Sequence, residues 1–572
     1  MMLVAIVLAV FYPGIFGEFC SSDDIPMVSS LLNMNDWSLK SLFVPKSGGG
    51  LYYRPLLYVT FIVDRFAWFL SSSFMHLENI LFHLVNSLLV YFLTRALLPE
   101  DKKDDSYLPL IASLCFGLHP ITTEPANWIS ARPDLMAGTF VLISACCLVT
   151  YKACHKKRLL IASLIAFLMA MLCKEVALAF VIGAGFILFS RNEPYSPPSI
   201  HASHLKKLMT FFLIFSLFVG TVLAFIFLRS LAFTNNSSKI ARTLTFIFND
   251  PDYSLLFCLR SLGFYVKKIF YPFPLNFTII DIDPLYEIVA VPVILATVYA
   301  GLKRSVVSAV YLSGIFLITP SFLIAFNQIA WTPYAERYIY IATAFVIVSV
   351  VVSAAPLLGR IKSKTCVFVG IACLLITMTV ATFQRNLIWQ SNVKLFKDTV
   401  EKSPGFNKAW NEYGVALAKK GDIEGAKAQF RKAASLYSFE YDDVSRLNLA
   451  FLKLKEGDEE GAVKGYLKVV EESKGNSSAA YRYLVSYYET KHRDARSDAE
   501  KFQTLEKLVK YNDKLYALTK EPFILYNNGR HLMFAGNKPQ ALEYLRRAYN
   551  VFPDGDEYKG YAQKLVSRLE KE

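Results

Sequence analysis

Long apolar stretches fill most of the first two thirds of the chain and limit it to a membrane-embedded helical fold. A helix needs about 20 predominantly apolar residues to cross the hydrocarbon core of a bilayer. The stretches that reach or approach this length are 76–98, 135–152, 207–229, 285–302, 306–326, 338–358 and 365–383. Shorter candidates are 2–16, 108–118, 158–173 and 176–190. The sequence therefore predicts an all-α, polytopic fold with about 11 spans.

Composition divides the chain into a membrane part and a soluble part. Of the 572 residues, 54% are hydrophobic and 19% are charged, whereas a soluble chain carries about 25% charged residues. The apolar excess lies in residues 1–385, and residues 386–572 have the composition of an ordinary soluble domain. We therefore predict two domains with these boundaries.

Basic residues between the spans indicate the orientation in the membrane. With the N-terminus inside, the inner connections carry the clusters at 152–158, 303–304 and 360–364, while the short outer connections carry single basic residues. An odd number of spans then places 386–572 outside. The expected location is a bacterial inner membrane with this domain in the periplasm, or alternatively the endoplasmic reticulum membrane with it in the lumen.

The charge pattern also indicates where the segment 253–271 lies and which partners the chain has. The segment 253–271 is apolar on one side but carries Arg260, Lys267 and Lys268, so we expect it to lie at the membrane interface. The net charge of +14 comes largely from the inner clusters, and no basic stripe is interleaved with aromatic residues. Membrane lipids, and not nucleic acid, are therefore the expected partners.

The soluble part contains a repeated pattern of small residues, an aromatic residue and a terminal proline, which is typical of tetratricopeptide repeats. The positions that superpose are Trp410, Gly414, Gly421, Ala426, Phe430 and Ala433, then Gly457, Ala462 and Tyr466, then Gly529, Gly536, Ala541, Leu545, Ala548 and Pro553. The stretch 478–517 is helical but irregular. Such repeats stack into an α-solenoid whose concave face binds extended peptide, although a brace for the membrane part is an alternative role.

Ionisable residues gather at the outer ends of the spans, where they are expected to mark function. The candidates are Asp23, Asp24, Arg54, His119, Glu124, Arg132, Asp134, Lys174, Glu175, Glu336 and Arg337. A carboxylate can accept a hydroxyl proton as a general base, and arginines can hold a phosphate and stabilise its developing charge. This set suits a reaction in which a hydroxyl attacks and a phosphate leaves.

Each candidate also has a structural interpretation. The Asp23-Asp24 pair can be a solvated loop or a helix N-cap, and His119 can be a packed loop histidine. The charges of 124–134 can form an ion-pair network, and those at 174–175 and 336–337 can lie at the interface. A divalent metal within 119–134 is an alternative, but the spacing fits no standard ligand set. On the second span, His76, Asn79, His83 and Asn86 share one helix face and predict a polar seam between helices.

Several short motifs carry a family resemblance that covers essentially the whole chain. They are Asp23-Asp24, Tyr53-Arg-Pro-Leu56, His76-Leu-Glu-Asn79 with His83, His119-Pro-Ile-Thr-Thr-Glu124, Arg132-Pro-Asp-Leu135, Lys174-Glu175 and Glu336-Arg-Tyr338. In this order, followed by the repeats, they resemble the transmembrane and tetratricopeptide-repeat-containing O-mannosyltransferases and their bacterial relatives. The short first span and the small number of repeats indicate a bacterial-type member.

The resemblance implies a GT-C glycosyltransferase fold and a protein O-glycosyltransferase activity. Enzymes of this kind pass a sugar from a polyprenyl-phosphate carrier to a Ser or Thr hydroxyl, and the acidic pair that supplies their base maps to Asp23-Asp24. No cofactor is expected. The acceptor polypeptide would be bound by the repeats. The rivals are an oligosaccharide ligase or polymerase that uses lipid-linked glycans and a non-enzymatic assembly or transport protein with a repeat scaffold.

Overall fold

The computed structural model describes residues 1–34, 36–44, 52–99, 103, 106–191, 204–232, 249–327, 332–358, 360–436, 443–554 and 556–571. These residues form helices and no β-strand, with one isolated antiparallel bridge between Ile279 and Tyr334. The chain divides into two compact units, Met1–Ser403 and Pro404–Glu572. The division therefore lies after residue 403, whereas the change in composition lies near 385.

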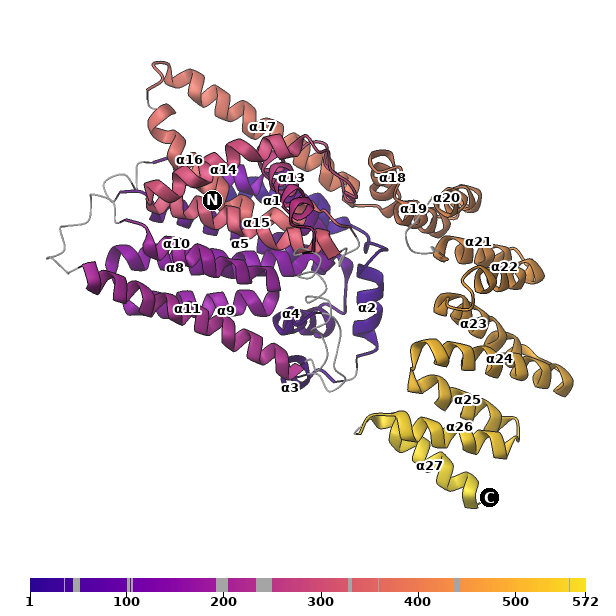
Figure 1. The fold of residues 1–572 in the computed structure, drawn as a ribbon. Coiled ribbons are helices and arrows are strands. Elements are labelled where there is room, and N and C mark those ends of the chain that lie inside the picture. The colour runs from indigo at the N-terminus through magenta and orange to yellow at the C-terminus, as the bar shows by residue number, and fades with distance from the viewer. Residues whose placement is uncertain are drawn as a thin grey trace. The chain divides into compact units, whose positions relative to one another are not determined.

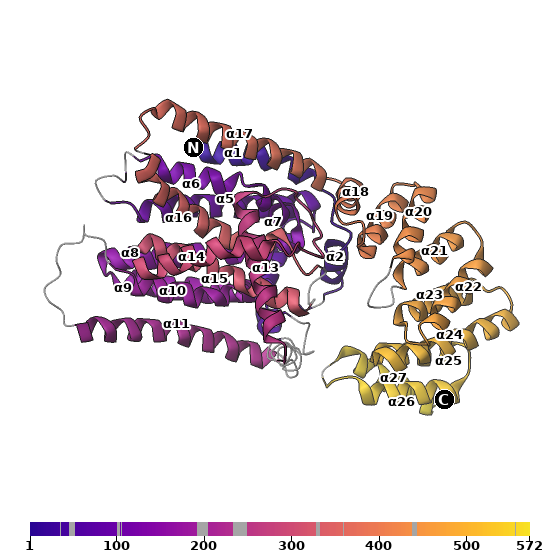
Figure 2. The same ribbon diagram turned by 45° about the horizontal axis from the view of Figure 1, so that its top comes forward.

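The first unit is a bundle of apolar helices (Figures 1 and 2). Within the described residues, seven helices are long and apolar enough to cross a membrane, in agreement with the seven long stretches of the sequence. The long helices are α5 (Ser72–Ala96), α8 (Arg132–Cys154), α11 (His204–Ala232), α14 (Tyr286–Lys303), α15 (Val306–Asn327), α16 (Tyr340–Leu358) and α17 (Lys364–Trp389). The shorter candidates are also helical: α1 (Met2–Phe11) with η1 (Tyr12–Phe16), α6 (Leu108–Gly117), α9 (Lys157–Cys173), and η5 (Glu175–Ala179) with α10 (Phe180–Phe189).

Short helices connect the spans, and four candidate residues lie in them: Asp24, Glu124, Glu336 and Arg337. These short helices are α2 (Asp24–Leu32), α3 (Leu39–Phe43), α4 (Pro55–Phe66), η3 (Pro120–Thr122), α7 (Thr123–Asn127), η4 (Ile129–Ala131), η6 (Glu336–Ile339) and α18 (Asn392–Lys402). The segment expected at the interface is the helix α13 (Pro251–Phe270), in which Ser254, Ser261 and Lys268 are buried together with apolar residues.

The predicted polar seam on α5 lies inside the bundle and joins several helices. The His83 Nδ1 lies 2.9 Å from the Tyr340 hydroxyl, and its Nε2 lies 3.0 Å from the Gly117 carbonyl oxygen. The Asn86 amide donates to the Leu135 carbonyl at 2.9 Å and to the Tyr340 hydroxyl at 3.0 Å. Because lipid offers no hydrogen-bond partners, these contacts specify how α5, α8 and α16 pack.

The second unit is a stack of antiparallel helix pairs, as the repeats predict. The helices are α19 (Asn407–Lys419), α20 (Ile423–Ser435), α21 (Val444–Lys455), α22 (Glu459–Glu472), α23 (Ser478–Asp494), α24 (Asp498–Thr519), α25 (Pro522–Phe534), α26 (Lys538–Val551) and α27 (Glu557–Lys571). Inside a pair the small residues are required: a Cβ on Gly414 would lie 2.5 Å from the Phe430 ring. The irregular stretch folds as a pair with a longer second helix, α23 and α24.

The turns inside three of these pairs use the same local chemistry. Gly421, Gly457 and Gly536 have φ values of 88°, 88° and 79°, a left-handed conformation that strongly favours glycine. The following residue then caps the next helix: Asp422 accepts from the Gly425 N–H at 2.9 Å, and Asp458 from the Gly461 N–H at 2.8 Å. The glycine and the acidic cap together set the sharp reversal of the chain.

Candidate functional site

The acidic pair lies at the start of α2, with Asp23 before the helix and Asp24 as its first residue, and the two carboxylates have different surroundings. Asp24 is fully buried and accepts three hydrogen bonds: from the Cys20 N–H at 3.0 Å, the Ser130 N–H at 2.8 Å and the Ser130 hydroxyl at 2.6 Å. Burial raises the pKa of Asp24 to about 6 in spite of these hydrogen bonds. Asp24 therefore fastens the loop before it to the segment that precedes α8.

Asp23 is exposed and lies at the N-cap position of α2 without capping it. Within the described part of the chain, no hydrogen bond to its carboxylate forms. Loss of hydration within the surrounding protein raises the pKa of the Asp23 carboxyl, and the positive charge of Arg337 partly offsets this rise. Asp23 is thus an accessible carboxylate with a cation nearby and both oxygens open to an incoming hydroxyl.

Arg337 is the basic residue whose charge acts on the Asp23 carboxylate. Contacts with Glu124, Trp128 and Tyr338 hold its side chain in place. Its Nη1 lies 2.5 Å from the Glu124 Oε1, and its backbone N–H donates to Glu124 Oε2 at 3.1 Å. The guanidinium lies 4.4 Å from the Trp128 ring centroid and 4.7 Å from that of Tyr338. Stacking and the ion pair fix the guanidinium plane, which is the arrangement that a bidentate oxyanion contact needs.

Two more ion pairs of the candidate set lie in the same electrostatic neighbourhood. The Lys174 Nζ lies 2.5 Å from the Asp134 Oδ1, and Arg54 contacts the Glu175 carboxylate at 3.0 Å. The Lys174 Nζ and the Arg337 guanidinium both lie over the Tyr338 ring, at 5.9 Å and 4.7 Å from its centroid, and Arg54 pairs with Glu175, the residue next to Lys174. Arg54, Lys174 and Arg337, which are far apart in sequence, therefore lie near one another, and the charge of Arg337 acts on Asp23.

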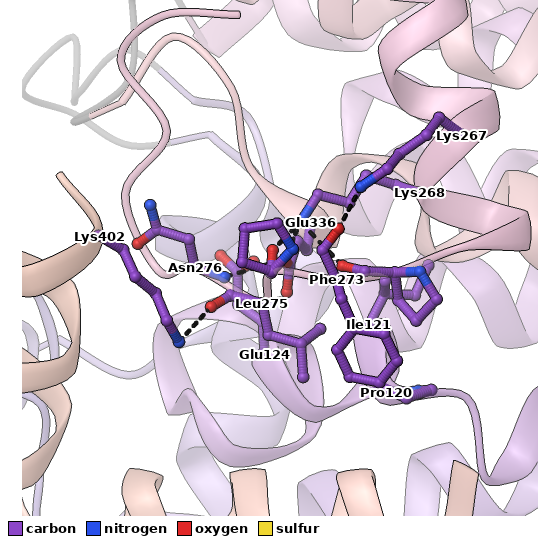
Figure 3. A network of polar contacts seen from close by, with 12 residues as sticks. Pro120, Ile121, Glu124, Lys267, Lys268, Phe273, Leu275, Asn276, Glu336 and Lys402 are labelled. Carbon is purple, nitrogen blue, oxygen red and sulfur yellow. Dashed lines mark hydrogen bonds and ion pairs between the residues drawn. The ribbon is translucent and has the colours of Figure 1, made fainter. Parts of the chain in front are cut away.

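Glu336 belongs to a network that the sequence did not predict (Figure 3). Its Oε1 lies 2.7 Å from the Lys268 Nζ and accepts the Asn276 N–H at 3.0 Å. Lys268 also donates to the Pro272 carbonyl at 2.9 Å. The Lys267-Lys268 pair at the end of α13 is the signal that the sequence offers for this network. The structure buries Lys268, whose ammonium group holds Glu336, the residue before Arg337.

Two candidate residues, Arg132 and His119, are buried and bonded to other groups of the fold. Arg132 is fully buried, and its guanidinium contacts Asp64 at 2.5 Å, Glu78 at 3.0 Å and Asn79 at 2.9 Å. In this conformation it offers a lipid phosphate no accessible donor, which favours the ion-pair interpretation. His119 is also buried, with its Nε2 at 2.8 Å from the Ile269 carbonyl oxygen and its Nδ1 accepting from the Ile121 N–H.

The histidine is a poor metal ligand for the same reason. Burial lowers the pKa of His119 to about 4, so the ring is neutral, but both ring nitrogens already have partners. Within the described residues, no group of three His, Cys, Asp or Glu side chains could hold a metal ion.

The curated proteins that are similar to this chain are named protein O-mannosyl-transferases. No family model matches the chain. It is 24% identical over 523 residues to "Protein O-mannosyl-transferase TMTC2" of Mus musculus, covering 75% of this chain and 61% of that protein. It is 26% identical over 486 residues to "Protein O-mannosyl-transferase TMTC3" of Homo sapiens, covering 76% and 50%. The resemblance inferred from the motifs is therefore confirmed.

One further relative matches over a shorter stretch, and one solved structure also matches. The chain is 29% identical over 145 residues to "Protein O-mannosyl-transferase Tmtc1" of Drosophila melanogaster, covering 24% of this chain and 16% of that protein. A chain of "Crystal structure of APC/C hetero-tetramer Cut9-Hcn1" matches with 13% identity and a TM-score of 0.18, covering 84% of this chain and 98% of that chain, and this score carries no argument. This chain spans 61% and 50% of the two long relatives.

Proposed function

We propose that this integral membrane protein is a protein O-glycosyltransferase that moves a sugar from a polyprenyl-phosphate carrier to a Ser or Thr hydroxyl. The observation that carries the proposal is the exposed carboxylate of Asp23, on which the charge of Arg337 acts, together with the fixed position of that guanidinium. The names of the relatives supply the reaction class. No cofactor beyond the lipid-linked donor takes part.

The proposed step is a single displacement that inverts the anomeric carbon. The Asp23 carboxylate accepts the proton of the acceptor hydroxyl as that oxygen forms its bond to the anomeric carbon. The bond between this carbon and the carrier phosphate breaks, and the phosphate leaves with the electron pair. Arg337, with Arg54 or Lys174, stabilises the negative charge that develops on the phosphate. Asp24 has a different role, since its hydrogen bonds keep the loop in place.

Glu124, Asp134, Glu175 and Glu336 act in this proposal as the partners that orient the cations. Each lies within 3.0 Å of a basic side chain. They keep the net charge of the site low enough to fold while leaving the cations ordered. Arg132 and His119 support the fold around the site and do not contact the substrate.

We propose that the site and the repeats both face the non-cytoplasmic side of the membrane, in a bacterial periplasm or, alternatively, in the lumen of the endoplasmic reticulum. A cysteine introduced by Lys420→Cys is expected to react with a membrane-impermeant thiol reagent in sealed cells or vesicles of the matching orientation. A cysteine at Lys303, on the inner side, is the matched control and should react only after lysis. Reversed labelling would contradict the orientation.

The repeats are proposed to recruit the acceptor polypeptide. Between α21, α22 and α23 lies a cavity of about 570 Å³ whose lining includes Phe451, Lys455, Arg482, Tyr483 and Tyr487. The double variant Phe451→Ala/Tyr487→Ala should lower transfer to a full-length protein acceptor about 10-fold, because aromatic side chains supply much of the affinity of such surfaces. Transfer to a short soluble peptide should be unchanged.

The control for this variant is Phe534→Ala, since Phe534 is exposed on α25 outside the cavity. Initial rates with the two acceptors are the measurement. An equal loss with both acceptors would favour the bracing role of the repeats.

A further inference from the structure

The helix α18 follows the last membrane helix, and its first residue, Asn392, forms hydrogen bonds to residues 18–21, which precede Asp23. The Asn392 side chain accepts the Ser21 N–H at 3.0 Å, and its amide donates to the Phe19 carbonyl at 2.9 Å and to Glu18 Oε2 at 3.1 Å. The Asn392 backbone N–H adds a contact to the same Glu18 oxygen at 3.2 Å. One residue of α18 therefore holds the chain from 18 to 21, immediately before Asp23.

Residues at the C-terminal end of α17 form further hydrogen bonds to the segment that leads to the acidic pair. The Gln390 amide donates to the Pro13 carbonyl at 2.7 Å, and the Gln390 carbonyl accepts the Glu18 N–H at 3.2 Å. The Asn386 amide donates to the Val10 carbonyl at 2.8 Å. Residues 10–21 are thus fastened to 386–392 by hydrogen bonds at several points, so the loop is positioned by a segment at the far end of the same unit.

The other end of α18 reaches the opposite side of the site. The Lys402 Nζ donates to the Leu275 carbonyl at 2.7 Å (Figure 3). The Ser403 hydroxyl donates to the Thr278 carbonyl at 2.6 Å and accepts from the Asn276 amide at 2.8 Å. Because the Asn276 N–H donates to Glu336, this segment leads directly to the residue before Arg337.

A row of aromatic side chains makes a second connection between α18 and Arg337. Phe396 of α18 lies 6.1 Å from Phe277 between ring centroids, and Phe277 lies 5.2 Å from Trp128. The Arg337 guanidinium lies over Trp128. Phe396 and Phe277 are almost completely buried. Close-packed interiors transmit displacement from one side chain to the next, so a shift of α18 would move both the acidic loop and the guanidinium.

We propose that α18 is a positioning element of the active site, which sets the distance between Asp23 and Arg337, and that Asn392 is its positioning residue on the acidic side. The inference rests on the proposed function. It assigns α18, which continues directly into the repeats at Pro404, a part in the chemistry besides its part as a connection.

The test uses the full chain and a short soluble acceptor peptide. Asn392→Ala should lower kcat about 10- to 100-fold, because a misplacement of about 1 Å costs up to this much, while the KM for the donor changes less than about twofold. Asn392→Asp should also be impaired, since its carboxylate would face the Glu18 carboxylate and the Phe19 carbonyl. Glu18→Gln should keep most of the rate, because the oxygen of the new amide can still accept from both the backbone N–H and the side-chain amide of Asn392.

Asn33→Ala is the matched control, since Asn33 is an exposed amide at the end of α2 that donates to the Ser29 carbonyl. A low kcat in both Asn392 variants with a near wild-type kcat in Glu18→Gln supports the inference. An unchanged kcat in Asn392→Ala, or an equal loss in Glu18→Gln, overturns it. If Asn392→Ala does not fold, the comparison of Asn392→Asp with Glu18→Gln decides. An inactive wild-type protein would instead overturn the proposed function, whereas an active one with an active Asn392→Ala overturns only the role of α18.

Discussion

Asp23→Asn is expected to abolish detectable sugar transfer while the protein still folds and binds its lipid-linked donor. The substitution keeps the size and shape of the side chain but removes the group that accepts the hydroxyl proton. Loss of general-base assistance costs about 10²- to 10⁴-fold in rate, which corresponds to about 3–5 kcal/mol of barrier. Asp23 is exposed and its carboxylate accepts no hydrogen bond within the described residues, so the substitution should leave the unfolding temperature in detergent unchanged.

The neighbouring carboxylate is the matched control. Asp24→Asn should keep its hydrogen bonds with Ser130 but lose the one from the Cys20 N–H, because an amide NH2 cannot accept it. A smaller loss of rate with a lower unfolding temperature is therefore expected. Transfer rates with a saturating acceptor peptide separate the two variants. Near wild-type rates in both single variants and in the double variant would show the mechanism to be wrong, and an inactive Asp24→Asn beside an active Asp23→Asn would exchange their roles.

The rate of the wild-type enzyme should also depend on pH through Asp23. The base must be ionised, so kcat/KM falls as pH falls through its pKa. Because the surrounding protein raises the pKa of Asp23 above its ordinary value, the acid limb of the profile should lie at higher pH than that of a free aspartate. A rate that stays constant down to the ordinary range of aspartate would contradict the assignment of Asp23 as the base.

Arg132→Met is expected to produce the largest loss of stability among the charged residues of the first unit. The fully buried guanidinium contacts the buried Asp64 at 2.5 Å and also Glu78 at 3.0 Å. Removing one partner of a buried ion pair leaves an uncompensated charge and costs about 3–5 kcal/mol. We expect low yield of folded protein and a strongly reduced unfolding temperature in detergent.

A second substitution tests the cause of this loss. Asp64→Leu removes the stranded charge, so the double variant with Arg132→Met should be more stable than Arg132→Met alone. If Arg132→Met folded normally and instead lost affinity for the donor, Arg132 would be a phosphate ligand and the ion-pair interpretation would be wrong.

The sequence predicted the features that depend on local pattern. The apolar stretches predicted the long helices because a span requires a run of about 20 apolar residues, and the spacing of Gly414 and Phe430 predicted a repeat pair. The side-by-side arrangement of His83 and Asn86 also followed from helical periodicity. These signals need no knowledge of which distant segments meet.

The residue pairs of the site could not be predicted in the same way. Arg132 was grouped with Glu124 and Asp134 because they are close in sequence, yet its partners are Asp64 and Glu78, while Glu124 pairs with Arg337. Lys268 and Asn392 were missed as site residues because their importance depends on contacts with Glu336 and with the loop at 18–21. Sequence patterns indicate which face of a helix is polar, but not which polar side chain lies opposite it.

The repeated glycine and acidic cap of the second unit have a mechanical consequence. Each helix of the array packs mainly against the helices before and after it, so the free energy that holds the unit is divided into similar increments along its length. Tension applied at the C-terminal end should remove α27 first and then one helix pair after another, at low and nearly constant force. The first unit, in which residues 10–21 are bonded to 386–392, should instead resist until a single larger rupture. A stretched molecule would thus extend its repeats long before its membrane bundle opened.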